Sequence, residues 1–175
     1  MWNEHSDSRG MTLTGRWNYH NELTIQLPIA AFRIVYAASG TLPVACLVRD
    51  IAAVIEHILY WSAPTSEAEG RYLCAIPNSE TARARAEKYQ SRGQFGARHF
   101  DKVIFNLPIP AFDAKNRLHR DLATAAAKAE TAAVAVALTE DTKFQRARRL
   151  IRDTLTEAGI AATIDRLVDR LLDGG

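Results

Sequence analysis

The sequence predicts an α+β fold, in which a small β-sheet with covering helices is followed by an alanine-rich antiparallel helical extension. Two observations predict the sheet: three short, β-prone segments precede residue 63, and glycine or proline punctuates the chain around them. A third observation predicts the extension, because from Asn116 onward glycine and proline nearly vanish and alanine dominates. The chain of 175 residues therefore divides into an α+β domain over residues 15–113 and a helical extension over residues 114–175.

The predicted strands are Phe32–Ala37, Pro43–Arg49 and Val54–Ser62. Each segment is short and rich in β-branched or aromatic residues, which pack well on a pleated surface. The first two are joined by Ala38–Leu42, which contains the turn signal Ser-Gly. This spacing predicts a β-hairpin.

Two helices are expected after the third strand. Ser66 is a typical N-cap residue, and it is followed by glutamates that suit the first turn of a helix. Pro77 disfavours helical geometry at the residue before it, so the first helix ends there. Asn78 or Ser79 then caps a second helix that runs to about Tyr89.

The next segment contains the predicted loop of the domain. Ser91–Ala97 has two glycines and no apolar periodicity, which predicts a loop. Arg98–Phe105 has apolar residues at helical spacing and predicts one short helix. Leu107–Phe112 contains two prolines, which exclude a central paired strand and allow an edge strand.

The C-terminal part is predicted to be entirely helical. A long helix follows Asn116, Thr142 caps another that continues to Ala158, and Gly159 ends it. The last helix, Ile160–Leu172, is amphipathic. Its apolar face predicts a surface for docking a partner, and the residues of that face are Ile160, Ile164, Leu167, Val168 and Leu171.

The order of these elements carries a set of short motifs: a helix that ends in Tyr-Leu-x-Ala-Ile-x-Asn-Ser, a glycine-bearing loop, and Leu-Pro-Ile-Pro. The matching residues are Tyr72, Leu73, Ala75, Ile76, Asn78, Ser79, Gly93, Leu107, Pro108, Ile109 and Pro110. From Leu27 to Phe112 the chain thereby resembles the target-recognition (TaqI-like specificity) region at the C-terminus of adenine-specific DNA methyltransferases from restriction–modification systems. It departs from that family at Pro77, where the family usually has leucine.

The resemblance implies a DNA-recognition module without a methyl-transfer site of its own. The family's catalytic motif, Asn-Pro-Pro followed by Tyr or Phe, is not present in the chain, and no catalytic residue is predicted. The cofactor S-adenosylmethionine is expected on a catalytic domain or subunit, which would be the partner of this chain together with double-stranded DNA. No metal site is predicted, because Asp50, Glu56 and Glu67 lack the lysine of a nuclease motif.

Basic residues gather around the predicted loop. Arginine forks and glutamine amides suit phosphate oxygens and base edges, and glycines let a backbone approach DNA closely. The candidate DNA-binding residues are Arg83, Arg85, Lys88, Arg92, Gln94, Arg98 and Lys102. The alternative interpretation of the same residues is a solvated helix face followed by an ordinary surface loop.

A second basic cluster lies on one predicted helix of the extension and comprises Lys143, Arg146, Arg148, Arg149 and Arg152. It suits a phosphate backbone or an acidic partner helix, and a solvated helix face is the simpler interpretation. The alternative function for the whole chain is therefore a structural module whose helical tail docks a partner subunit without contacting DNA.

The bulk composition restricts the function only broadly. The net charge is +2, so a DNA-binding surface has to come from local clustering. The two cysteines, Cys46 and Cys74, lie in apolar runs and are expected to be buried free thiols. No signal peptide and no apolar run of membrane-spanning length is found, and a cytoplasmic protein without a membrane partner is expected.

Overall fold

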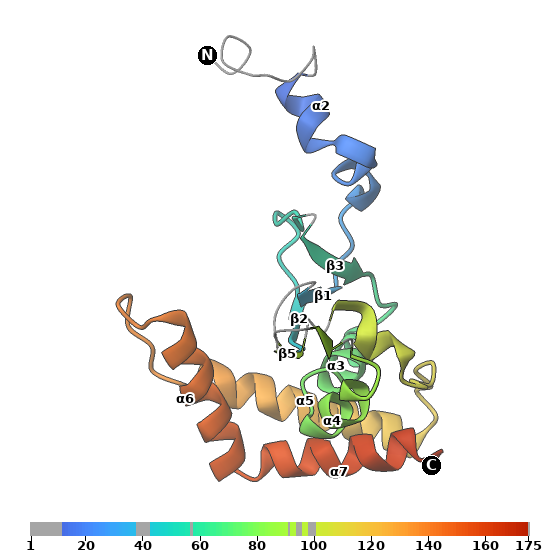
Figure 1. The fold of residues 1–175 in the computed structure, drawn as a ribbon, viewed down its shortest axis with the longest axis vertical. Helices are drawn as coiled ribbons and strands as arrows, with labels where there is room; N and C mark the ends of the chain where they lie inside the picture. The colour runs from blue at the N-terminus through green and yellow to red at the C-terminus, as the bar shows by residue number, and fades with distance from the viewer. Residues whose placement is uncertain are drawn as a thin grey trace.

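The computed structural model describes residues 12–37, 43–56, 58–90, 92–93, 96–97 and 101–174, and its fold is α+β (Figure 1). A small antiparallel sheet lies between an N-terminal arm of short helices and a layer of longer helices from the C-terminal half. The arm consists of α2 (Leu13–Trp17) and two 3-10 turns, η1 (Tyr19–Asn21) and η2 (Thr24–Gln26). The sheet and the longer helices form the body of the protein.

Three strands form the main sheet, as the sequence predicts: β1 (Arg33–Ala37), β2 (Ala45–Val48) and β3 (Leu59–Ser62). Their order is β2-β1-β3, and both pairings are antiparallel. The pairing of β1 with β2 agrees with the predicted hairpin, whose connection 38–42 lies outside the described residues.

The third strand is shorter than predicted because the backbone at Ile55 has another partner. The side-chain amide of Gln26 donates to the Ile55 carbonyl at 2.8 Å, and the Ile55 N–H donates back to the Gln26 side-chain oxygen at 2.8 Å. These two bonds occupy the groups that a strand ladder would use. Gln26 is buried as a result.

The two helices after the sheet begin where the sequence predicts. In α3 (Glu67–Ala75) the Ser66 hydroxyl accepts a hydrogen bond from the Glu69 N–H, and the helix ends before Pro77. In α4 (Glu80–Glu87) the Ser79 hydroxyl accepts from the Ala82 N–H at 3.0 Å. Each side-chain cap satisfies an N–H group that the helix itself leaves free.

The segment after α4 differs from the prediction in three places. Two-residue strands, β4 (Arg92–Gly93) and β5 (Gly96–Ala97), pair antiparallel where a loop was expected. The following helix, η3 (Asp101–Asn106), is a 3-10 helix, and residues 98–100 lie outside the described ranges. The predicted edge strand at Leu107–Phe112 is wrong, because Leu107 is buried and accepts a turn hydrogen bond from the Ile109 N–H at 2.8 Å.

The C-terminal part is helical as predicted, with α5 (Arg117–Val134), α6 (Phe144–Glu157) and α7 (Ile160–Leu172). Asn116 caps α5 through its side chain, and Gly159 ends α6 in a left-handed conformation with φ of 68°. The predicted cap Thr142 is one residue early: Lys143 occupies the N-cap position, and the Thr142 hydroxyl accepts from the Thr139 N–H instead.

A single hydrophobic core joins the two predicted parts. Tyr72 of α3, Leu122 of α5 and Val168 of α7 are fully buried in it, as is Ile76, the C-cap of α3. Helix α5 packs along α3, and α7 packs on both α5 and α4 (Figure 1). The boundary at residue 113 therefore does not separate two cores.

This packing corrects the predicted docking face of α7. Four of its five residues are buried in the core of the chain itself, and the fifth is partly buried; they are Ile164, Leu167, Val168 and Leu171, and Ile160. An amphipathic pattern marks a face that needs burial, and here α5 and α4 supply the cover. The face is thus not open to a partner.

Candidate nucleic-acid interface

Tyr72 joins the two halves of the motif set identified in the sequence. Its side chain is fully buried, and its hydroxyl donates a hydrogen bond of 2.9 Å to the Pro110 carbonyl oxygen. Its ring lies 5.4 Å from that of Phe112 and 4.8 Å from that of His119, measured between ring centroids. Burial raises the pKa of the Tyr72 hydroxyl to about 12, so it stays a hydrogen-bond donor at neutral pH. The hydrogen bond and the ring contacts therefore link α3 to the proline segment.

Asn78 joins the end of α3 to the sheet. Its side-chain oxygen accepts from the Ala45 N–H at 3.1 Å, and its amide nitrogen donates to the Ala45 carbonyl at 2.7 Å. The same nitrogen donates to the Cys74 carbonyl at 2.9 Å. Asn78 thereby satisfies both backbone groups of one β2 residue and one carbonyl of the last α3 turn. The motif residues Tyr72 and Asn78 act as structural links.

Two of the candidate DNA-binding arginines are held by carboxylates of the chain. Arg83 pairs with Glu80 and Glu87 on its own helix. Arg85 pairs with Asp169 of α7 and with Asp173 at the C-cap of this helix, with nitrogen–oxygen distances of 2.5 Å and 2.8 Å. Hydrogen bonding to Glu80 raises the pKa of Arg83, and hydrogen bonding to the two aspartates raises the pKa of Arg85. The structure therefore places these two arginines in ion pairs of the fold.

Two candidate lysines are exposed at the two ends of the loop segment. Lys88 is the C-cap of α4, and its ammonium lies 5.0 Å from the centroid of the Tyr89 ring. Lys102 belongs to η3, and its ammonium lies 5.4 Å from the centroid of the Tyr60 ring. Helix α4 and η3 pack against each other. The chain between the two lysines is thus fixed at both ends to the same part of the molecule.

The remaining three candidates fall where the structure gives no side-chain description. Gln94 and Arg98 lie outside the described residues, and of Arg92 only the backbone is described. That backbone pairs with Ala97, while Gly93 pairs with Gly96. The described part of the loop is therefore a short antiparallel ladder, and Gln94 lies between its two strands in the sequence.

The second basic cluster lies on α6 and its N-cap Lys143, and its members differ from Arg83 and Arg85. Lys143, Arg146, Arg149 and Arg152 are exposed, and Arg148 is partly exposed. In the described part of the chain, none of the ion pairs includes one of these five side chains. The Arg148 guanidinium lies 5.4 Å from the centroid of the Phe144 ring.

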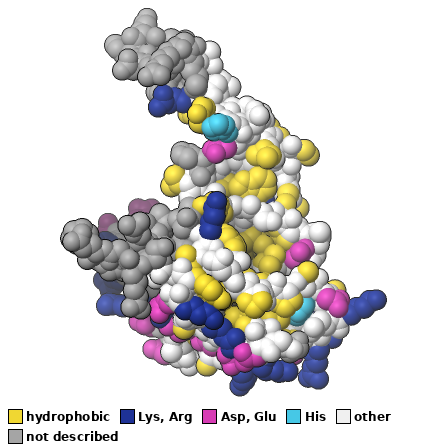
Figure 2. All heavy atoms as spheres, turned by 45° about the vertical axis from the view of Figure 1, so that its right-hand side comes forward, with side chains coloured by type: hydrophobic (Ala, Val, Ile, Leu, Met, Phe, Trp, Pro, Cys, Tyr) yellow, Lys and Arg dark blue, Asp and Glu magenta, His cyan; other side chains and the backbone are white. Residues whose placement is uncertain are grey.

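Charges of both signs are interspersed elsewhere on the surface. Figure 2 shows acidic and basic side chains side by side over the helical part of the face it presents, with hydrophobic side chains gathered above them. The near-neutral total charge is therefore also locally balanced on this face.

Sequence reasoning missed an ion-pair network between α3, β2 and α5. Arg49 donates to Glu67 at 2.7 Å and to Glu130 at 2.8 Å, and Arg71 lies 3.2 Å from both carboxylates. The hydrogen bond from Arg49 lowers the pKa of Glu67. The spacing of Glu67 and Arg71 by four residues is a sequence signal for part of this network. The contacts to Glu130 come from the fold alone.

Sequence reasoning also missed Arg33, which is fully buried at the start of β1. Its guanidinium donates to the backbone carbonyls of Ala53 and Asp50, both at 2.5 Å. Its Nε is buried without a hydrogen-bond partner in the described chain. Arg33 thus holds the loop 50–53 beside the sheet through backbone contacts. An arginine within a β-prone run was the only signal in the sequence.

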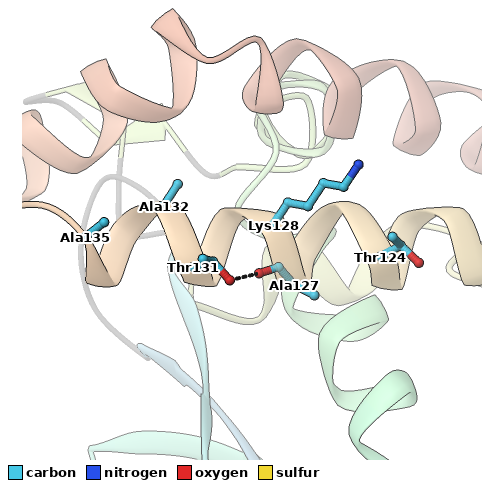
Figure 3. A pocket seen from close by; sticks show the side chains of 6 residues that line it. All are labelled: Thr124, Ala127, Lys128, Thr131, Ala132 and Ala135. Carbon is cyan, nitrogen blue, oxygen red and sulfur yellow. Dashed lines mark hydrogen bonds between the residues drawn. The ribbon is translucent and has the colours of Figure 1, made fainter.

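A groove of about 420 Å³ runs along α5 (Figure 3). One helix supplies its lining, which consists of Thr124, Ala127, Lys128, Thr131, Ala132 and Ala135. The Thr131 hydroxyl donates to the Ala127 carbonyl at 3.0 Å within this helix. Lys128 brings the single charged group of the lining. Small side chains and one lysine give no set of convergent polar groups for a small molecule.

No group of three or more His, Cys, Asp or Glu side chains in the described ranges is arranged to hold a metal ion. None of the described helices combines the length and the hydrophobicity that a membrane crossing needs.

Comparison of the chain with models of known protein families, with curated proteins and with solved structures finds no match.

Proposed function

We propose that this chain is a DNA target-recognition module of an adenine-specific DNA methyltransferase from a restriction–modification or phage-defence system. It reads or clamps duplex DNA and does not itself carry the methyl-transfer site. The observation that carries the proposal is the arrangement of the motif residues. Tyr72 hydrogen-bonds to Pro110, and Asn78 hydrogen-bonds to Ala45 of β2, so α3, the sheet and the proline segment are linked into one frame. The loop attached to this frame has an exposed lysine at each end.

In this proposal the basic residues around the frame have different roles. Lys88 and Lys102 are exposed and contact phosphates, which fixes the position of the module on the duplex. Arg92, Gln94 and Arg98 contact bases or phosphates from the loop between them. The module clamps the duplex while the target adenine is flipped into the catalytic region. Arg83 and Arg85 support the frame through their ion pairs and do not contact DNA.

S-adenosylmethionine binds to the partner catalytic domain or subunit in this proposal. The groove on α5 does not fit the cofactor, because its lining offers no carboxylate for ribose hydroxyls and no aromatic face for adenine. This chain contributes the grip on DNA, and the catalytic region contributes the methyl donor and the adenine pocket.

A second candidate function, docking of a partner subunit by the helical tail, is favoured by a different set of residues from those predicted. Val134, Leu138 and Phe144 lie around the connection between α5 and α6 and expose 86%, 45% and 72% of their surface. Exposed apolar side chains mark an interaction site where they form one contiguous patch, and these three follow one another closely in the chain. This surface is compatible with DNA binding by the loop, so both functions can belong to the chain.

A selection from a pool of randomised duplexes tests the proposed reading of bases. The wild-type chain is expected to enrich a short common sequence, and the double variant Arg92→Ala/Arg98→Ala is expected to lose this enrichment with unchanged circular dichroism. The matched control is Arg83→Ala/Arg85→Ala, which removes the same number of arginines from the frame and keeps the enriched sequence. Enrichment by the loop variant equal to that of the wild type would exclude this loop as the reader.

A further inference from the structure

The basic face of α6 brings together several cations that form no ion pair in the part of the chain that the structure describes. Arg49, Arg71, Arg83, Arg85 and Arg117 each pair with an acidic side chain. The four arginines of α6 and Lys143 at its N-cap do not pair within the part of the chain that the structure describes, although Asp153 and Glu157 belong to the same helix. Their charge is therefore available to a ligand.

The basic side chains are presented by a helix that the fold holds in place. Helix α6 packs on α5 and α7 through partly buried apolar residues, including Leu150, Ile151 and Leu155. An α-helix has 3.6 residues per turn, so Arg149 and Arg152, both exposed, lie on the side away from these residues. Arg148 is partly buried and lies at the border between this side and Leu155. Two exposed guanidinium groups and one partly exposed group thus lie along one surface of the helix.

We propose that this face of α6 grips the phosphate backbone of duplex DNA without reading sequence. The inference rests on the proposed function, because it takes the ligand of the loop and the ligand of α6 to be the same duplex. The observation behind it is that the arginines of α6 form no ion pair among the described residues and carry the charge opposite to that of DNA. Arginine forks bind phosphate oxygens with two hydrogen bonds, and the charges on DNA repeat closely enough for one helix face to meet more than one phosphate.

The face suits a phosphate backbone better than an acidic protein segment. A protein segment needs an apolar recess for its side chains as well as charge, and the outer side of α6 is convex and carries arginines, with Phe144 exposed at its first turn. A phosphate backbone needs only donors on an accessible surface. Phosphate contacts therefore match what this helix presents.

The position of Arg152 relates the α6 face to the proposed reading loop. The positive charge of Arg152 contributes, after the hydrogen bond from Arg83, to the lowered pKa of Glu80 at the start of α4. Lys88 ends the same helix, which is roughly 12 Å long at 1.5 Å per residue. Arg152 thus lies near the start of the helix whose end leads into the loop.

The test is the salt dependence of the affinity for duplex DNA, measured by fluorescence anisotropy with the full chain and a labelled duplex of mixed sequence. In the variant Arg148→Gln/Arg149→Gln/Arg152→Gln, the slope of log affinity against log salt is expected to fall by about 2 to 3, since each phosphate contact contributes about 0.9. The affinity at 100 mM salt is expected to fall roughly 10- to 100-fold. Circular dichroism is expected to be unchanged, because these arginines form no ion pair in the described chain.

Two further variants make the outcome decisive. Lys115→Gln/Arg117→Gln/Arg170→Gln removes three positive charges from the end of the helical layer opposite α6 (Figure 1) and is expected to keep the wild-type slope. Arg148→Lys/Arg149→Lys/Arg152→Lys keeps the charge and is expected to keep most of the slope. A glutamine variant of α6 that behaves like the charge-matched control would overturn the inference. Failure of the proposed reading loop is distinguishable, because it abolishes sequence enrichment and leaves the contribution of α6 to the salt slope intact.

Discussion

The hydroxyl of Tyr72 and the carbonyl oxygen of Pro110 are joined by a hydrogen bond of 2.9 Å across 38 residues of sequence. This contact links α3 to the proline segment after η3. Between these two points the chain forms α4, the short β4–β5 ladder and η3, and it carries the candidate loop. The Tyr72–Pro110 contact therefore holds together the two ends of the segment that carries the loop. A recognition loop requires such a fixed support.

Replacement Tyr72→Phe tests this closure. It removes the hydroxyl and leaves the Pro110 carbonyl without its donor, while the ring remains packed against Phe112 and His119. The free energy of unfolding is expected to fall by about 1 to 2 kcal/mol in urea denaturation. The control Tyr89→Phe changes a half-exposed tyrosine and is expected to have little effect. Equal effects of the two variants would contradict a structural role for the Tyr72 hydroxyl.

Replacement Asn78→Ala tests the link between α3 and the sheet. The variant leaves the Ala45 N–H and carbonyl, and one α3 carbonyl, without their side-chain partner. The expected loss is about 2 to 3 kcal/mol in the free energy of unfolding, measured by urea denaturation. Asn106→Ala, at an exposed asparagine of η3, is expected to stay within about 0.5 kcal/mol of the wild type. A loss for Asn78→Ala as small as for this control would mean that water replaces the side chain at β2.

The two cysteines are expected to react at very different rates. Burial raises the pKa of the Cys74 thiol to about 12, and the side chain lies in the core. Cys46 is exposed, which corrects the expectation of two buried thiols, although partial burial also raises its pKa. Maleimide labelling at pH 8, followed by mass spectrometry, is expected to modify Cys46 and to reach Cys74 only in denaturant. Labelling of both at similar rates in the native protein would contradict the packing of α3.

Acid is expected to weaken the network around Glu67. The hydrogen bond from Arg49 lowers the pKa of Glu67 in the folded protein. A carboxyl whose folded pKa is lowered stabilises the protein above its unfolded pKa, about 4.3, and this contribution is lost as the pH falls through the folded value. Thermal unfolding between pH 6 and pH 3 is therefore expected to show a smaller loss of Tm for Glu67→Gln than for the wild type. A parallel decline in both proteins would place the acid-sensitive groups elsewhere.

Local signals in the sequence predicted the helices well. Ser66 and Ser79 cap α3 and α4 as expected, and Gly159 ends α6, because caps act within one turn and need no tertiary contact. The strand at Val54–Ser62 was overestimated because Gln26, 29 residues earlier, occupies the backbone of Ile55. No local pattern reveals such a contact.

The candidate site was predicted less completely than the fold. A run of basic residues on α4 does not reveal that Arg85 faces Asp169, because 84 residues separate them. The apolar stripe of α7 correctly indicated a face that needs cover, and only the fold shows that α4 and α5 provide it. Partner choice depends on tertiary contacts, whereas periodicity reports only the need for burial.

The central claim is that the exposed lysines around the loop, and not the paired arginines of α4, contact DNA. The most direct measurement compares the affinities of Lys88→Gln/Lys102→Gln and Arg85→Gln for a labelled duplex by fluorescence anisotropy at 50 and 200 mM salt. The lysine variant is expected to bind several-fold more weakly and to lose about 2 from the salt slope, because two phosphate contacts are removed. Arg85→Gln is expected to bind like the wild type and to lose at most about 1 kcal/mol of stability. A wild-type chain that does not bind duplex DNA even at 50 mM salt would contradict the account.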